Sequence, residues 1–96
     1  MTINELVREC HRTAVDHGFW VDSPNVGEKI ALMHSELSEA LEGARHNNYD
    51  NVAEEMADVC IRVFDFCGHY YIDLEDALEK KMAINKERSY KHGKQF

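Results

Sequence analysis

The chain has little proline and glycine, and it has no long apolar run. One proline and five glycines occur in 96 residues, so few positions interrupt a helix. No apolar segment approaches the roughly 20 residues that span a bilayer, and the first residues lack the pattern of a secretory signal. The sequence therefore predicts one all-α domain over residues 1–96, located in the cytoplasm and not in a membrane.

Positive charge and cysteine are also scarce. Eleven Lys and Arg residues stand against eighteen Asp and Glu, a net charge of -7, so a nucleic acid or an anionic membrane would repel the chain at long range. Cys10, Cys60 and Cys67 show no C-x-x-C spacing, which indicates reduced thiols rather than a disulfide or zinc framework. We predict no nucleic-acid or membrane partner, and we assign Cys60 and Cys67 to the core.

Two acidic pairs stand out among the residues that are present. Glu36-x-x-Glu39 and Glu55-x-x-Asp58 lie on either side of a short polar link, in segments whose apolar residues recur every three or four positions. At about 100° per residue, both pairs have the same angular offset from their apolar stripes. A short link favours an antiparallel helix pair. The four carboxylates are therefore expected to face the same side at nearly the same level.

Four carboxylates brought together would repel one another, and some would take up protons. A hard divalent cation removes this repulsion, and oxygen ligands suit Mg²⁺, with Mn²⁺ as a substitute, better than zinc. The alternative is that both pairs lie on ordinary solvated helix faces, and spacing alone does not decide between the two. A carboxylate-bridged di-iron bundle is disfavoured, because no Glu in the chain has a His three residues later.

Capping signals divide the chain into four helices. Thr2 and Glu5 have the spacing of a capping box, Asn51 precedes the second acidic segment, and Asp73 precedes the last periodic segment. Gly68 is expected to end the third helix. The core of so short a chain is modest, which favours assembly with further copies. The predicted helices cover about residues 2–17, 26–45, 51–67 and 74–88, with a connector over 18–25.

The end of the chain is basic, with six of the eleven Lys and Arg residues in its final seventeen positions. Cations near a helix C-terminus are favourable in any protein, and basic side chains near a metal site also bind phosphate. Charge alone does not decide between these interpretations.

The two acidic pairs, together with the run KMAINKERSY at residues 81–90, resemble the MazG-like all-α nucleoside triphosphate pyrophosphohydrolases. The resemblance extends from about residue 11 to residue 94. It implies a four-helix MazG-like bundle that assembles as a homodimer or homotetramer. It also implies Mg²⁺-dependent hydrolysis of nucleoside triphosphates between the α and β phosphates, which yields the monophosphate and pyrophosphate.

The resemblance assigns roles to individual residues. Glu36, Glu39, Glu55 and Asp58 would ligate the metal, and one of them, or Glu54, would take the proton from the attacking water. The phosphate-binding residues would be Lys81, Asn85, Arg88, Tyr90 and Lys94.

The pattern is closest to the dCTP pyrophosphatase branch, which places His11 and Trp20 at the base. Otherwise Trp20 anchors the connector to the core and His11 is an exposed helix residue. Ser35 stands where many members have a leading Glu, which leaves the general base open. Arg62 stands where that branch has a tyrosine, and this difference weakens the inference that dCTP is the substrate. Arg62 could pair with Asp58 or reach a phosphate.

A second class of function is a non-catalytic MazG-like helical module that binds nucleotide or regulates a partner. Retention of all four acidic positions together with Lys81 and Asn85 favours the enzyme. Removal of unwanted nucleotides and adjustment of dNTP pools would use the same chemistry, and a preference like that of a dUTPase is a further alternative.

Overall fold

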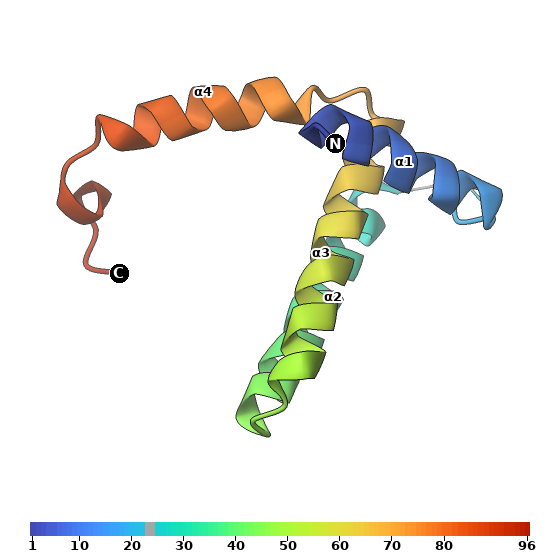
Figure 1. Cartoon of the computed structure of the whole chain (residues 1–96), viewed down its shortest axis with the longest axis horizontal. Coiled ribbons are helices and arrows are strands. Elements are labelled where there is room, and N and C mark those ends of the chain that lie inside the picture. The colour runs from blue at the N-terminus through green and yellow to red at the C-terminus, as the bar shows by residue number, and fades with distance from the viewer. Residues whose placement is uncertain (23–24) are drawn as a thin grey trace.

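The computed structural model describes residues 1–22 and 25–96, so two residues of the predicted connector lie outside the described part (Figure 1). Within these residues the chain forms four α-helices, one 3₁₀ turn and no strand, which confirms the all-α prediction. None of these helices combines the length and apolarity needed to cross a membrane. The elements are α1 (Ile3–Asp16), α2 (Val26–Arg45), α3 (Tyr49–His69), α4 (Leu74–Lys86) and η1 (Tyr90–Gly93).

Side-chain caps set where the helices begin. The capping box of α1 is confirmed, since Thr2 Oγ1 accepts from the Glu5 amide at 3.1 Å and the Glu5 carboxylate accepts from the Thr2 amide at 2.9 Å. Asp73 caps α4, as predicted. The prediction that Asn51 caps α3 is wrong, because Asn48 takes that place and its side chain accepts from the Asn51 amide at 3.2 Å. The acidic helix α3 therefore begins earlier than predicted.

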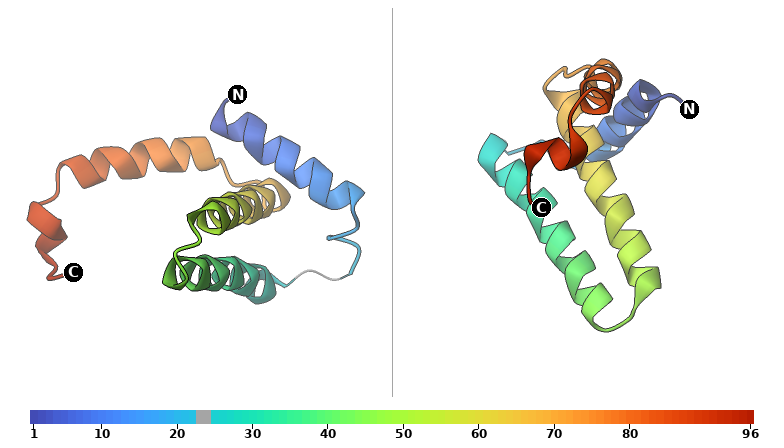
Figure 2. Two further views of the ribbon diagram at one scale, coloured as in Figure 1. Left: turned by 60° about the horizontal axis from the view of Figure 1, so that its bottom comes forward. Right: turned by 90° about the vertical axis from the view of Figure 1, so that its left-hand side faces the viewer.

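The first three helices pack around α3. Helices α2 and α3 form an antiparallel pair, and α1 crosses the C-terminal half of α3 (Figures 1 and 2). The prediction that Gly68 ends α3 is wrong, because Gly68 lies inside the helix. A Cβ atom at Gly68 would lie 2.6 Å from the Cβ of His11. Glycine thus allows α1 to approach α3 closely at this point, and the helix continues to His69.

The core within one chain is thin. Among the described residues, only three hydrophobic residues, Val7, Ala40 and Cys67, are buried. Cys60 is exposed, so its assignment to the core is wrong, whereas that of Cys67 is confirmed. Even the predicted apolar stripe of α2 remains accessible, with Leu41 54% exposed. The reason is that α2 packs mainly against a single neighbour, α3.

Helix α4 does not close a bundle with the other three helices. Its start is tied to α1, where the Asn4 side-chain amide donates to Asp73 Oδ1 at 2.9 Å, and α4 then leads away from the α2–α3 pair (Figures 1 and 2). Every residue from Asp76 onward is exposed, including Met82 at 61% and Ile84 at 51%. The predicted four helices are present, but a closed four-helix bundle is not formed by one chain.

Candidate metal centre and adjoining cavity

Three glutamates meet between α2 and α3. Glu36 and Glu39 come from α2 and Glu55 comes from α3, and each offers a carboxylate oxygen within 4.8 Å of the other two. Their meeting follows from the matched offsets of the two acidic pairs, because an antiparallel pair turns equal offsets to the same side. Asp58, the fourth acidic residue, is exposed and lies outside this cluster. It lines a cavity beside the cluster together with Glu36.

The two glutamates of α2 make Glu55 hold its proton to a higher pH than an ordinary carboxyl does. Hydrogen bonding to Glu36 and then to Glu39 raises the pKa of Glu55 to about 7. The same bond to Glu55, followed by the bond to Arg62, lowers the pKa of Glu36. Glu55 thus serves as the proton donor among three carboxylates that would otherwise repel one another.

Arg62 neutralises part of the remaining charge. Its Nε donates to Glu36 Oε1 at 2.8 Å, and the Glu36 side chain is only 12% exposed. Of the two predicted partners of Arg62, the structure replaces Asp58 by Glu36, and the contact with a phosphate stays a prediction. Arg62 follows Glu55 by seven positions, which is almost two helical turns. Arg62 therefore lies on the side of α3 that faces α2.

The cluster fits a hard divalent cation. All of its donor atoms are carboxylate oxygens, which Mg²⁺ and Mn²⁺ prefer. Glu55 Oε2 is buried and has no hydrogen-bond partner among the described residues. Such an atom is costly to leave unsatisfied, and a cation would satisfy it.

A cavity of about 540 Å³ adjoins the cluster. Its volume lies within the roughly 300–1,000 Å³ of small-molecule sites. Lys29 and Glu36 both line it, and their separation of seven positions corresponds to about 10.5 Å along α2. The cavity therefore extends from the carboxylates to the start of α2, where the connector contributes Phe19 and Trp20.

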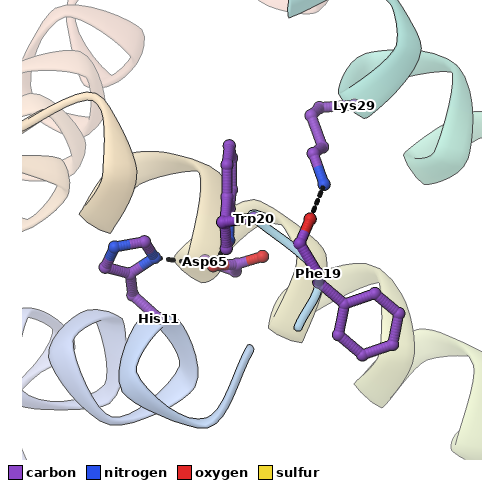
Figure 3. A network of polar contacts seen from close by, with 5 residues as sticks. All are labelled: His11, Phe19, Trp20, Lys29 and Asp65. Atoms are coloured by element: carbon purple, nitrogen blue, oxygen red, sulfur yellow. Dashed lines mark hydrogen bonds and ion pairs between the residues drawn. The ribbon is translucent and has the colours of Figure 1, made fainter. Parts of the chain in front are cut away.

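Trp20 and His11, the predicted base-binding residues, meet at Asp65. Trp20 Nε1 donates to Asp65 Oδ1 at 2.9 Å, and His11 Nδ1 contacts the same oxygen at 2.8 Å (Figure 3). Trp20 lines the cavity and is half-buried, whereas His11 is not among the lining residues. His11 therefore reaches the cavity only through Asp65 and Trp20.

Asp65 is a functional candidate that the sequence analysis missed. The available signal was its spacing, because Asp65 follows Asp58 by seven residues and hence lies on the same side of α3. It also stands between Phe64 and Phe66, where an acidic side chain needs a partner. Neither signal identifies Trp20 and His11 as those partners, because both lie more than forty residues away.

The predicted phosphate-binding residues do not reach the cluster within one chain. They lie on α4 and in the segment after it, which leads away from α2 and α3 (Figure 1). All of them are exposed, and none lines the cavity. These residues are Lys81, Asn85, Arg88, Tyr90 and Lys94.

The raised pKa of Glu55 predicts a pH-dependent stability of the metal-free protein. The pKa is about 7 in the folded chain against an ordinary 4.5, so the folded state holds a proton that the unfolded state has lost. This stabilisation is complete below pH 4.5 and is lost as the pH rises through 7. The melting temperature of the wild type should therefore fall between pH 5 and 8 relative to that of Glu55→Gln, measured in EDTA. Parallel melting curves for the two proteins across this range would contradict the pKa shift.

Together these features define an all-helical protein with a carboxylate cluster beside a cavity of small-molecule size. Residues 27–92 match the family model of the MazG nucleotide pyrophosphohydrolase domain. Because this match spans more than half of the chain, the chain belongs to the MazG family. It includes the three clustered glutamates and leaves His11 and Trp20 outside. Comparisons with curated proteins and with solved structures gave no match.

Proposed function

We propose that this chain is a Mg²⁺-dependent nucleoside triphosphate pyrophosphohydrolase that acts in the cytoplasm, with Mn²⁺ as a possible substitute metal. It cleaves between the α and β phosphates and releases the nucleoside monophosphate and pyrophosphate. The observation that carries the proposal is the cluster of Glu36, Glu39 and Glu55, with its partnerless buried oxygen, beside a cavity of about 540 Å³. Membership of the MazG family supports the reaction type.

The roles within the site follow from its chemistry. Glu36, Glu39 and Glu55 hold the cation, and Asp58 joins them from the cavity side. When bound, the cation neutralises phosphate charge and lowers the pKa of water. The general base is one of these carboxylates or Glu54, since each can accept a proton.

Arg62 joins the carboxylate cluster to the cavity. Its guanidinium pairs with Glu36. With a cation at Glu36, the guanidinium would suit a phosphate oxygen, which Arg binds in bidentate fashion. Arg62 lines the cavity, so a nucleotide bound there would place its phosphates near the guanidinium.

For the base, we propose stacking on Trp20, with His11 acting through Asp65. Stacking on an aromatic ring suits every base, and preference for a pyrimidine dNTP such as dCTP is the finer part of the proposal. The stacking is supported by Trp20 in the cavity wall and by the hydrogen bond that holds Trp20 at Asp65. A dUTP preference would use the same stacking.

We further propose that the active form is a homodimer or homotetramer. One chain buries few apolar residues and exposes Leu78, Met82 and Ile84 along α4. The basic end of the chain complements the acidic α2–α3 pair in charge. In an assembly, α4 of one copy brings Lys81 and Asn85 to the carboxylates of another, which one chain alone does not achieve.

The test is pyrophosphate release from the four canonical dNTPs, dUTP and the four NTPs, with Mg²⁺, with Mn²⁺ and with EDTA. We expect metal-dependent release with the monophosphate as the second product. The pyrimidine nucleotide that is hydrolysed fastest identifies the base preference. Nucleotide binding without release from any substrate would instead support the non-catalytic regulatory module. One observation favours that alternative: within one chain, no predicted phosphate ligand lies at the cluster.

A further inference from the structure

Both faces of the Trp20 indole are covered in the free chain. His69 stacks on it with the ring centroids 3.7 Å apart and the planes at 7°. The Lys29 ammonium lies over the ring, 4.1 Å from its centroid. A stacked ring and an ammonium at these distances cannot share one face without overlap, so they cover opposite faces. Figure 3 shows Lys29 on the side of the ring away from His11, and His11 is the residue that also contacts His69.

The two covers differ in how readily they move. His69 belongs to α3 and packs edge-on against both His11 and Tyr70. Lys29 reaches Trp20 through a flexible side chain, and its ammonium also donates a hydrogen bond of 3.0 Å to the carbonyl oxygen of Phe19 in an exposed setting. An exposed cation–π contact changes an equilibrium constant by a factor of about two to five. Lys29 is therefore the cover that a ligand can displace.

The side that Lys29 covers is the side of the cavity. Lys29 and Trp20 both line it, together with Glu36 and Asp58, whereas His69 does not. Lys29 and Glu36 are almost two turns apart on α2, so they lie on the same side of that helix. A ligand that stacks on Trp20 and carries phosphate toward Glu36 must pass the Lys29 side chain.

We propose that Lys29 is a mobile cover of the base subsite, which leaves Trp20 when a nucleotide binds and pairs with a phosphate of that nucleotide. This inference rests on the proposed function, because it takes the cavity as the nucleotide site and Trp20 as the stacking platform. A base cannot stack on the cavity side of Trp20 until the ammonium departs. The displaced ammonium then needs an anionic partner, which a nucleotide provides and a nucleoside lacks.

This exchange makes Lys29 a specificity-determining residue. A nucleoside loses affinity because it displaces a cation without compensating it. A nucleotide recovers that loss through a charge-assisted contact between the ammonium and phosphate. Lys29 therefore favours phosphorylated ligands over free nucleosides, even before any metal is bound.

The test uses Trp20 as its own probe, since it is the only tryptophan in the chain. The four deoxynucleosides and their 5′-monophosphates are titrated in EDTA against the wild type and Lys29→Ala. Binding is followed by Trp20 fluorescence and by the single indole N–H resonance. Lys80→Ala is the matched control, because Lys80 is an exposed lysine of α4 that pairs with Asp76 at 2.9 Å and does not line the cavity.

In Lys29→Ala, the Kd of the best-bound nucleoside should fall about twofold to fivefold, and the Kd of its monophosphate should rise by about threefold. Lys29→Gln, which keeps the chain length without the charge, should shift both values in the same directions. Lys80→Ala should leave both unchanged. An unchanged or raised nucleoside Kd in Lys29→Ala, or shifts of both ligands in one direction, would overturn the inference.

The result separates this inference from the proposed function. Opposite shifts of the two ligands in a protein that never releases pyrophosphate would support the mobile cover and contradict the enzyme. Pyrophosphate release by a protein whose Trp20 signals respond to no nucleoside or monophosphate would support the enzyme and overturn the cover.

Discussion

Glu39→Gln is expected to lower kcat/KM for pyrophosphate release by at least about a thousandfold, because it removes one charged ligand from the proposed metal site. The substitution keeps the shape of the side chain, and Glu39 is exposed, so the helices should remain intact by circular dichroism. Pyrophosphate release and Mg²⁺ titration on the same preparation provide the measurement.

The matched control is Glu42→Gln. Glu42 lies three residues further along α2, is 61% exposed and pairs with Arg45, outside the cluster. It loses the same charge from the same helix, so its activity should stay near that of the wild type. Equal loss in both variants would indicate a general effect of charge and contradict the metal site. Asp58→Asn tests the fourth ligand: full activity would limit the site to the three clustered glutamates.

Mixing two inactive variants is expected to restore activity. Lys81→Ala and Glu39→Gln should each be nearly inactive alone, because one lacks a phosphate ligand and the other a metal ligand. If Lys81 acts on the carboxylates of another copy, a mixed dimer contains one site with both residues intact. Random exchange at equal concentrations then restores about a quarter of the wild-type activity, since half of the dimers are mixed and each holds one intact site.

The control mixture combines Glu39→Gln with Glu55→Gln. These two residues meet within one chain, so every site in a mixed dimer lacks one of them and the mixture should remain inactive. Sedimentation equilibrium should give at least twice the 11.1 kDa of one chain. A monomeric mass with full activity, or no recovery when the Lys81 and Glu39 variants are mixed, would contradict an active site shared between copies.

The cluster carries part of its own charge compensation, although Glu55 Oε2 has no hydrogen-bond partner among the described residues. A proton shared from Glu55 and the guanidinium of Arg62 reduce the repulsion among the three glutamates. A cation held by Glu36, Glu39 and Glu55 would take over this charge compensation, and the Arg62 guanidinium would then suit a phosphate oxygen. At the far end of the cavity, the Lys29 ammonium likewise has a partner within the chain, the ring of Trp20. We propose the same exchange for Arg62 and Lys29: each would pair with a phosphate when a nucleotide binds.

Much of the fold could be predicted because it depends on local patterns. The capping box at Thr2, the cap at Asp73 and the apolar spacing of α2 are properties of a few neighbouring residues, and each predicts a helix boundary or face. The cap of α3 was mispredicted because Asn48 and Asn51 are both suitable caps, and only the course of the link after α2 selects the first. Gly68 looked like a helix end, but contact with His11 explains a glycine there just as well.

The candidate site divides in the same way. The acidic pairs were found from spacing because helical geometry fixes the angle between residues three apart, and a short link fixes how the two helices pair. Asp65 and Lys29 were not found, since their partners come from α1 and the connector. The pairing of Arg62 with Glu36 instead of Asp58 likewise depends on how closely α2 and α3 pack.

The sequence by itself determined that this protein is all-helical, that four helices occupy nearly their observed ranges, and that two acidic pairs face one side of a helix pair. These properties depend on periodicity and capping, which act over a few residues. Only the tertiary structure decided that Trp20 is enclosed between His69 and Lys29, that Glu55 shares a proton with its neighbours, and that α4 leads away from the carboxylates. Contacts between distant segments determine these features, because side-chain packing and local electrostatics depend on which residues meet in space.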